Sequence, residues 1–332
     1  MSTPTPLRSL IGGIGLSLPV HALLVLNGNV FGISGFVHRA VRGSKEGWAA
    51  VIGLVTGGIV AGFLEGQAPR LELPGMPLVL LSGFLVGVGT RMANGCTSGH
   101  MIAGLSRLSK RSLTATLMFF ATGVPVARTL HANLPARNEA EPLALSSYAN
   151  SLLIAQAIPF LLVLLLYLRT PSPPSENTDS RAQAQCDTSI TTFPRLVTFW
   201  ATSVEFALAL RLSELSEPTK VLSFLLLPMH PAFDPSLMCL AAGALPVSFC
   251  LYRFCRGPER PRLGGKWSIP TGGAIDTKLV AGAALFGVGW GISGICPGPA
   301  LVNLGRALVS GSEISASLAW LAAFIAGGFI TK

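Results

Sequence analysis

The residues of this chain best suited to chemistry are two cysteines, each in a similar segment of one half of the chain. Cys96 ends the stretch 87–96, GVGTRMANGC, and Cys296 ends the stretch 287–296, GVGWGISGIC. Each segment follows an apolar run and leads into another, so each interrupts a hydrophobic stretch beside a thiol. In membrane proteins, matched interruptions in two halves of a chain indicate a substrate site where two repeats meet. Small buried cysteines are also common packing residues, but the matched placement favours function.

The two breaks offer weak donors and helix ends rather than strong charges. A short helix is expected after each cysteine, with Thr97 or Ser98 as a cap of the first and Pro297 in the first turn of the second. Two helix N-termini that face one another would present unpaired N–H groups and positive dipole ends to an anion. Small and polar residues around them complete the predicted substrate pathway: Asn94, Gly95, Thr97, Ser98, His100, Ser293, Pro297, Gly298 and Asn303.

Charged residues inside apolar runs are costly in a bilayer and usually functional. This chain has seven of them: Arg91, Glu205, Arg211, Glu214, Glu217, Lys220 and Arg306. We expect Arg91, Glu217 and Lys220 to support the site. Two alternatives are that the charges between 214 and 220 only pair with one another, and that Arg306 reaches the bilayer surface. His100 is compatible both with packing and with proton transfer.

The composition is that of a membrane protein. Half of the residues are hydrophobic, 12% are charged and the mean hydropathy is +0.58, whereas soluble domains carry about twice this share of charge. The net charge of +9 belongs to short loops between apolar runs, so the positive-inside rule explains it without a nucleic-acid partner. The six cysteines form no CxxC motif and no cluster with zinc spacing, so we expect no disulfide framework, no metal and no other cofactor.

The apolar runs predict an all-α, polytopic membrane protein with about nine crossings. The candidate segments are 10–27, 48–66, 77–93, 97–106, 112–130, 149–168, 196–212, 218–228, 236–252, 277–291, 297–309 and 314–331. Several are too short to cross about 30 Å of hydrocarbon alone. We therefore expect interrupted single crossings, broken around Asn27–Gly35 and at three pairs of segments: 77–93 with 97–106, 196–212 with 218–228, and 277–291 with 297–309.

The order of these segments predicts one transmembrane domain, residues 1–332, built from two inverted-topology repeats whose short helices meet near the membrane centre. Repeat one spans about 10–130 and repeat two about 196–331. The helix at 149–168 connects them and is followed by a cytoplasmic linker at 169–195. Lys and Arg gather in alternate loops, which places the N-terminus outside and the C-terminus in the cytoplasm. No organelle-type presequence is recognised, so we expect the plasma membrane.

Two motifs also resemble a known family. Residues 94–100, NGCTSGH, followed by Arg107, resemble the first signature of the YeeE/YedE sulfur-transport family, and residues 287–299, GVGWGISGICPGP, resemble the second. Weaker similarity at 32–35 and 216–221 extends the resemblance over nearly the whole chain. The resemblance implies an hourglass-like helical membrane protein that takes up thiosulfate or a related inorganic sulfur anion.

The resemblance assigns Cys96 and Cys296 the role of guiding the substrate through a central constriction. Bacterial thiosulfate importers of the family carry a third cysteine in the first broken segment, and residues 29–33 of this chain contain none. The outer uptake step and the choice among sulfur and selenium species therefore stay open. A thiol can contact the soft terminal sulfur of thiosulfate without binding it tightly, and transport requires weak, sequential contacts.

Other classes of protein are also compatible with these residues. A membrane sulfurtransferase would form a persulfide on an activated cysteine that faces water, but residues 1–332 contain no soluble catalytic domain, so we expect no enzyme. A carrier for chloride, sulfite, selenite or a small neutral solute would use the same breaks, whereas a structural subunit has no need of them. The expected partners are the anion and the lipid bilayer; a cytoplasmic sulfur-carrier protein would suit the basic loops but is not required by them.

Overall fold

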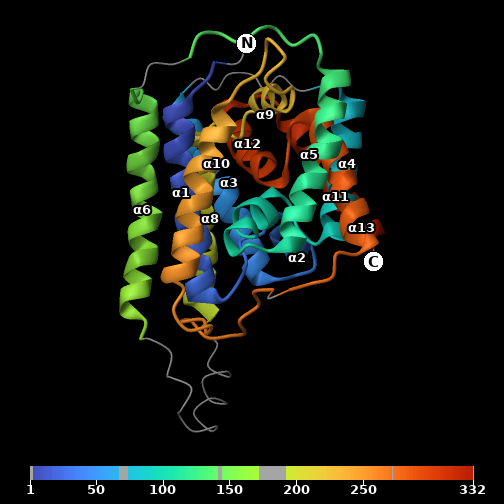
Figure 1. Cartoon of the computed structure of the whole chain (residues 1–332). Helices are drawn as coiled ribbons and strands as arrows, with labels where there is room; N and C mark the ends of the chain where they lie inside the picture. Colours follow the sequence, from blue (N-terminus) through green and yellow to red (C-terminus); the bar gives the residue numbers. More distant parts are fainter. Residues whose placement is uncertain (1–2, 67–73, 141–143, 172–191, 271, 332) are drawn as a thin grey trace.

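The computed structural model describes residues 3–66, 74–140, 144–171, 192–270 and 272–331, so most of the predicted linker lies outside the described residues (Figure 1). Every regular element in these ranges is helical. The elements are α1 (Pro6–Asn27), α2 (Ile33–Val41), α3 (Lys45–Glu65), α4 (Met76–Ala93), η1 (Ser98–Ile102), η2 (Leu105–Arg107), α5 (Lys110–Leu130), α6 (Ser147–Arg169), α8 (Thr192–Leu212), α9 (Pro218–Leu225), α10 (Ser236–Phe254), α11 (Thr277–Ser293), α12 (Pro297–Ser310) and α13 (Ile314–Ile330).

Seven segments of the described chain are long and apolar enough to cross a membrane. They are Pro6–Asn27, Lys45–Glu65, Met76–Ile102, Lys110–Leu130, Ser147–Arg169, Ser236–Phe254 and Thr277–Ser310. Helix α6 lies at the edge of the bundle (Figure 1) and exposes large apolar side chains, with Ile154 71% and Ile158 72% exposed. Such a surface suits lipid hydrocarbon rather than water. The chain is therefore an all-α, polytopic integral membrane protein, as the composition predicts.

The predicted count of nine crossings is larger than these seven because it includes two further segments. Helix α8, predicted at 196–212, packs along α3 and α1, and α13, predicted at 314–331, packs along α4. Helix α13 has 17 residues and is shorter than the seven spans. Both helices lie beside the long ones in Figure 1. Nine membrane crossings therefore remain a prediction.

Helices end inside the bundle at residues in the left-handed backbone conformation. Helix α1 ends at Gly28 (φ 65°), α4 at Asn94 (φ 56°) and α11 at Gly294 (φ 69°), and the turn after α8 contains Glu214 (φ 58°). At the first three residues the backbone N–H donates to the carbonyl four residues earlier. One left-handed residue thus ends a helix while its polar backbone stays paired, which a membrane interior demands.

The predicted breaks are present, but the segment after Cys96 differs from expectation. In place of a helix at 97–106 the chain forms a π-helical turn, η1, and a short 3-10 turn, η2. Helix α12, in contrast, begins at Pro297 with Cys296 as its N-cap residue. The prediction of two facing helix N-termini is therefore wrong at Thr97, because a turn of five residues aligns too few peptide dipoles to act as a helix end.

Small residues let α4 and α11 approach until their backbones touch. A Cβ atom on Gly89 would lie 2.6 Å from the carbonyl oxygen of Gly282, and a Cβ atom on Gly282 would lie 2.6 Å from the backbone N of Ala93. Membrane helices associate through such close contacts because lipid is as apolar as their side chains. Gly89 and Gly282, together with Gly289 against the carbonyl of Ser82, therefore let the two helices that precede the cysteines pack closely.

We expect Gly89→Ala to lower the free energy of unfolding by about 1–3 kcal/mol, because the added methyl group has no space between α4 and α11. The measurement is reversible denaturation of the purified protein in detergent. Gly35→Ala is the matched control, since nothing lies within 4 Å of a Cβ at Gly35 in α2. Equal stability of the two variants would contradict this account of the α4–α11 interface.

Candidate functional site

The interrupted elements meet around the two cysteines. Thr97 Oγ1 lies 3.5 Å from Cys296 Sγ, and Cys96 Sγ lies 3.3 Å from Ser98 Oγ. Ser98 Oγ also accepts a hydrogen bond of 3.2 Å from the backbone N–H of Ile33, at the start of α2. The turn after Cys96 thus contacts both α2 and α12. We call Cys96, Thr97, Ser98 and Cys296 the cysteine constriction.

The cysteine constriction is closed in this conformation. Cys96 is 1% exposed and Cys296 is 6% exposed. A Cβ atom on Gly298 would lie 2.7 Å from Cδ1 of Ile33 and 3.2 Å from Cδ1 of Leu210, so apolar side chains press against the first turn of α12. An anion can pass this level only if these side chains move apart.

His100 and Gly95 shape the turn that carries Cys96. The ring of His100 lies 3.1 Å from Ser112 Oγ through Nδ1 and 3.2 Å from the carbonyl of Ala93 through Nε2. A Cβ atom on Gly95 would lie 2.7 Å from His100 Nε2, so only glycine leaves room for the ring. With both nitrogens engaged, His100 has the contacts of a packed histidine and ties η1 to α5.

Ser293 and Asn303 shape the breaks of the second half of the chain. Ser293 Oγ accepts a hydrogen bond of 3.3 Å from the backbone N–H of Ile295 and so supports the turn at Gly294. Asn303 Nδ2 donates a bond of 2.8 Å to the carbonyl of Ser216, which joins α12 to the break before α9. Both residues are buried. Asn303 Oδ1 also accepts a bond of 3.1 Å from Arg306 Nη1, so the contacts of both residues are those of a positioning role.

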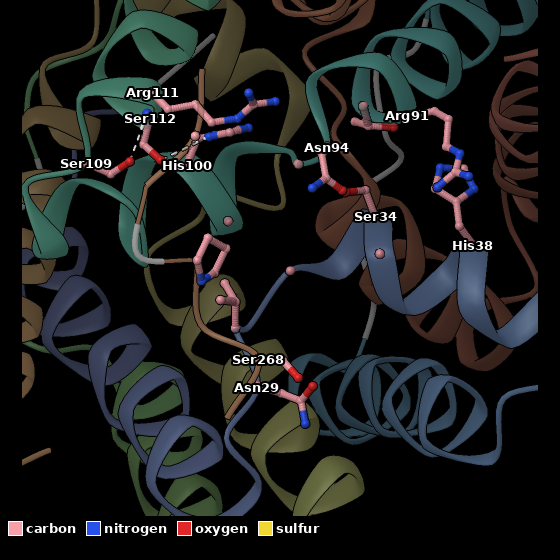
Figure 2. A pocket seen from close by; sticks show the side chains of 18 of the residues that line it. Asn29, Ser34, His38, Arg91, Asn94, His100, Ser109, Arg111, Ser112 and Ser268 are labelled. Carbon is pink, nitrogen blue, oxygen red and sulfur yellow. Dashed lines mark hydrogen bonds between the residues drawn. The ribbon is translucent and has the colours of Figure 1, made fainter. Parts of the chain in front are cut away.

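A cavity of about 610 Å³ lies against one side of the cysteine constriction (Figure 2). Gly32, Gly95 and Gly99 form part of its wall, and Asn94 and His100 also line it. Its lining contains five arginines and, among the residues that the structure describes, neither Asp nor Glu: Arg39, Arg42, Arg91, Arg107 and Arg111. A concave surface with charges of one sign concentrates ions of the other sign. We call this space the basic cavity.

Near helices α9 and α12, which Figure 1 labels, acidic and basic side chains neutralise one another instead. Glu65 pairs with Arg211 and lies 2.8 Å from Nη2 of Arg306. Glu217 lies 2.6 Å from Nη1 of Arg211 and 3.0 Å from Nη1 of Arg306. These four residues join the end of α3 to α8, α12 and the break before α9. Arg306 is 2% exposed, so its guanidinium group is held inside the protein by these carboxylates.

Lys220 belongs to a neighbouring group of ion pairs. It pairs with Glu214 and lies 3.7 Å from Asp234, and Arg8 lies 2.8 Å from Glu214. We call both groups together the paired-charge cluster. Charges that are buried and paired hold the surrounding elements in place but leave little free charge for a ligand. Lys220 pairs with Glu214, as the alternative of mutual pairing predicts, whereas Glu217 pairs with Arg211 and Arg306 of other elements.

Of the basic cavity, only Arg91 could be anticipated from the sequence as a site residue. Arg39, Arg42, Arg107 and Arg111 belong to the charge bias of the loops, and Arg107 and Arg111 also follow the first family signature. Helix α2 and the turns after Cys96 fold these residues back against the breaks. The signal in the sequence that could have revealed the cavity is the presence of basic residues close to both breaks of repeat one.

Comparisons with known proteins match both halves of the chain. Residues 6–125 match a family described as sulphur transport, and residues 195–331 match a family of unknown function, DUF6691. A probable transporter of Xylella fastidiosa (strain 9a5c) is 42% identical over 121 residues, which cover 36% of this chain and 90% of that protein. A probable transporter of the strain Temecula1 is 39% identical over 110 residues, which cover 33% of this chain and 74% of that protein.

We expect Glu65→Gln to lower the free energy of unfolding by about 3–5 kcal/mol, because it leaves Arg211 and Arg306 buried with the single carboxylate of Glu217. The measurement is again denaturation in detergent. Glu259→Gln is the control, since Glu259 is 47% exposed in its pair with Arg256 and such surface pairs contribute about 0–1 kcal/mol. A small loss for Glu65→Gln, equal to that of the control, would mean that the paired-charge cluster does not hold the breaks.

Proposed function

Since this chain belongs to the sulphur transport (YeeE/YedE) family, and is thus a sulfur-related membrane transporter, we propose that its substrate is thiosulfate or a related inorganic sulfur anion. The observation that carries the proposal is the contact between the two breaks, where Thr97 lies 3.5 Å from Cys296 Sγ, next to a cavity lined by arginine. Cation-lined space suits an anion, and thiols suit soft sulfur. Few small solutes combine both properties.

The path that we propose runs through the cysteine constriction. The anion meets the thiols of Cys96 and Cys296, with the hydroxyl groups of Thr97 and Ser98 as further weak donors. None of these four groups carries a fixed positive charge, so the anion is bound weakly and can leave again, as transport requires. The arginines of the basic cavity then receive it beyond the constriction.

The direction of transport follows from the predicted orientation. Arg39 and Arg42 of the basic cavity lie at the end of α2, in the segment 37–47 that the charge bias assigns to the cytoplasm. With the N-terminus outside and the C-terminus inside, the basic cavity opens toward the cytoplasm of a cell whose plasma membrane holds the protein. The two halves, 10–130 and 196–331, act in this proposal as inverted repeats whose breaks part to open the constriction.

A sulfurtransferase activity finds less support. A persulfide intermediate requires a thiolate that meets its sulfur donor and acceptor in water, whereas Cys96 and Cys296 are almost fully buried. A cytoplasmic sulfur-carrier partner stays a prediction of the basic loops. Transport without covalent chemistry is the proposed activity.

We expect Cys96→Ala and Cys296→Ala each to reduce thiosulfate uptake by about tenfold or more, the effect of about 1.4 kcal/mol on the barrier to passage. The measurement is uptake of labelled thiosulfate by cells without an importer of their own. Cys250→Ala, which changes an exposed cysteine of α10, is the control and retains uptake.

Normal uptake by both constriction variants would show that the thiols only pack. If wild-type protein is present in the membrane but takes up no thiosulfate, the substrate proposal is wrong, and sulfite, selenite and chloride become the solutes to measure.

A further inference from the structure

The five arginines of the basic cavity differ in how their donors are used. Arg107 donates hydrogen bonds of 2.7 Å to the carbonyl of Ala103 and 3.1 Å to that of Pro270. Arg111 donates a bond of 2.6 Å to the carbonyl of Ala274. These bonds fix both side chains to the turns after Cys96 and to the segment between α10 and α11. Arg107 and Arg111 therefore add positive potential to the cavity while their donors hold its wall together.

Arg42 and Arg91 are different, because neither guanidinium group forms a hydrogen bond or ion pair with any residue in the described part of the chain. Arg42 follows the last turn of α2. Arg91 lies in the last turn of α4, inside the span Met76–Ile102. Figure 2 shows Arg91 of α4 and His38 of α2 pointing toward one another at the same wall of the cavity. Two elements thus bring unpaired cations to one place.

An unpaired arginine within a membrane span is costly, and such residues normally find a partner. This chain follows that rule elsewhere, since Arg211 and Arg306 share the carboxylates of the paired-charge cluster. At the basic cavity Asp276 lies 3.9 Å from Arg111, but among the described residues no carboxylate pairs with Arg42 or Arg91. Two further nitrogens of lining residues, His38 Nε2 and Arg39 Nε, are buried without a hydrogen-bond partner. The missing partner at this wall is an acceptor with negative charge.

The chemistry of the wall also limits what such an acceptor must be. Neither Cys96 nor Cys296 lines the basic cavity, so no thiol is available there to recognise sulfur. Guanidinium groups recognise the charge and the oxygen atoms of an oxyanion. A volume of about 610 Å³ also leaves space for the water that a small inorganic dianion retains.

We propose that Arg42 and Arg91, together with His38, form a binding site for a soluble inorganic dianion in the basic cavity, separate from the cysteine constriction. Its place in transport rests on the proposed function: the site receives the anion after the constriction has selected it. Because the site recognises charge and oxygen, sulfate binds there as thiosulfate does. Selection for sulfur is left to the thiols.

The test is equilibrium binding of radiolabelled sulfate to the full-length protein in phosphatidylcholine nanodiscs at low ionic strength. Wild-type protein binds sulfate saturably. Arg91→Gln and Arg42→Gln each weaken binding by about tenfold or more, since each removes a charge-assisted hydrogen bond. Arg91→Lys keeps the charge and retains most of the affinity. Added salt weakens binding to wild-type protein because it screens the charges.

Arg128→Gln is the matched control, because it removes the same charge from an exposed position near the end of α5, outside the cavity. All variants are first compared by size-exclusion chromatography, and two independent arginines keep the test valid if one variant fails to fold. Absence of saturable sulfate binding to wild-type protein overturns the proposal. Equal affinities of Arg91→Gln, Arg42→Gln and Arg128→Gln overturn it as well.

A second arm distinguishes a soluble anion from a lipid headgroup. The binding measurement is repeated in nanodiscs that contain phosphatidylglycerol. An unchanged sulfate affinity supports a soluble dianion, and loss of binding means that the headgroup is the occupant and overturns the proposal.

The outcome is also separate from that of the uptake experiment. Sulfate binding that depends on Arg91, with no thiosulfate uptake by wild-type protein, would leave this site standing and reject the proposed substrate. Thiosulfate uptake that depends on the cysteines, together with sulfate binding that Arg91→Gln does not change, would support the proposed substrate and reject this site.

Discussion

The structure depends on one constraint, which is that backbone polar groups inside a membrane must be paired by the protein itself. A helix can be interrupted there only if its end is closed by an ordered turn. Gly28, Asn94 and Gly294 close such ends through left-handed caps. Side chains complete the pairing where caps do not suffice, as Ser98 does for the N–H of Ile33 and Asn303 for the carbonyl of Ser216. The interruptions are therefore ordered, and they bring Thr97 of the first break to 3.5 Å from Cys296 Sγ of the second.

The charges around the breaks are divided between two regions of opposite character. In the paired-charge cluster, Arg211 and Arg306 share carboxylates with Glu65 and Glu217, so the region is close to neutral and binds the elements to one another. In the basic cavity, Arg91 keeps its charge for whatever enters. The same residue type thus stabilises the fold on one side of the constriction and creates a positive potential on the other. What separates the two uses is whether a carboxylate lies within reach.

Much of the fold and part of the site could be predicted from the sequence. The apolar runs predicted an all-helical membrane protein, and the glycine-rich and proline-rich interruptions predicted where helices stop, since these residues have local conformational preferences that packing does not override. The irregular turns η1 and η2 after Cys96 were not predicted. They depend on His100, whose ring contacts Ser112 of α5 and the carbonyl of Ala93 in α4, and such contacts between elements are not visible in the local sequence. Ser293 and Asn303 were predicted as pathway residues, yet their bonds to Ile295 and Ser216 are structural.

The sequence by itself determined the membrane class, the breaks and the two cysteines that lie beside them, because composition and local backbone preference are properties of short segments. Only the tertiary structure decided which charged side chains form ion pairs and which have no partner. Glu217 and Lys220 are charged residues within apolar segments, as Arg91 is, and the neighbouring sequence does not distinguish which of them is paired. Pairing depends on distances between elements far apart in the chain, such as the approach of Glu65 to Arg306. The basic cavity exists because no carboxylate among its described lining residues makes that approach to Arg91.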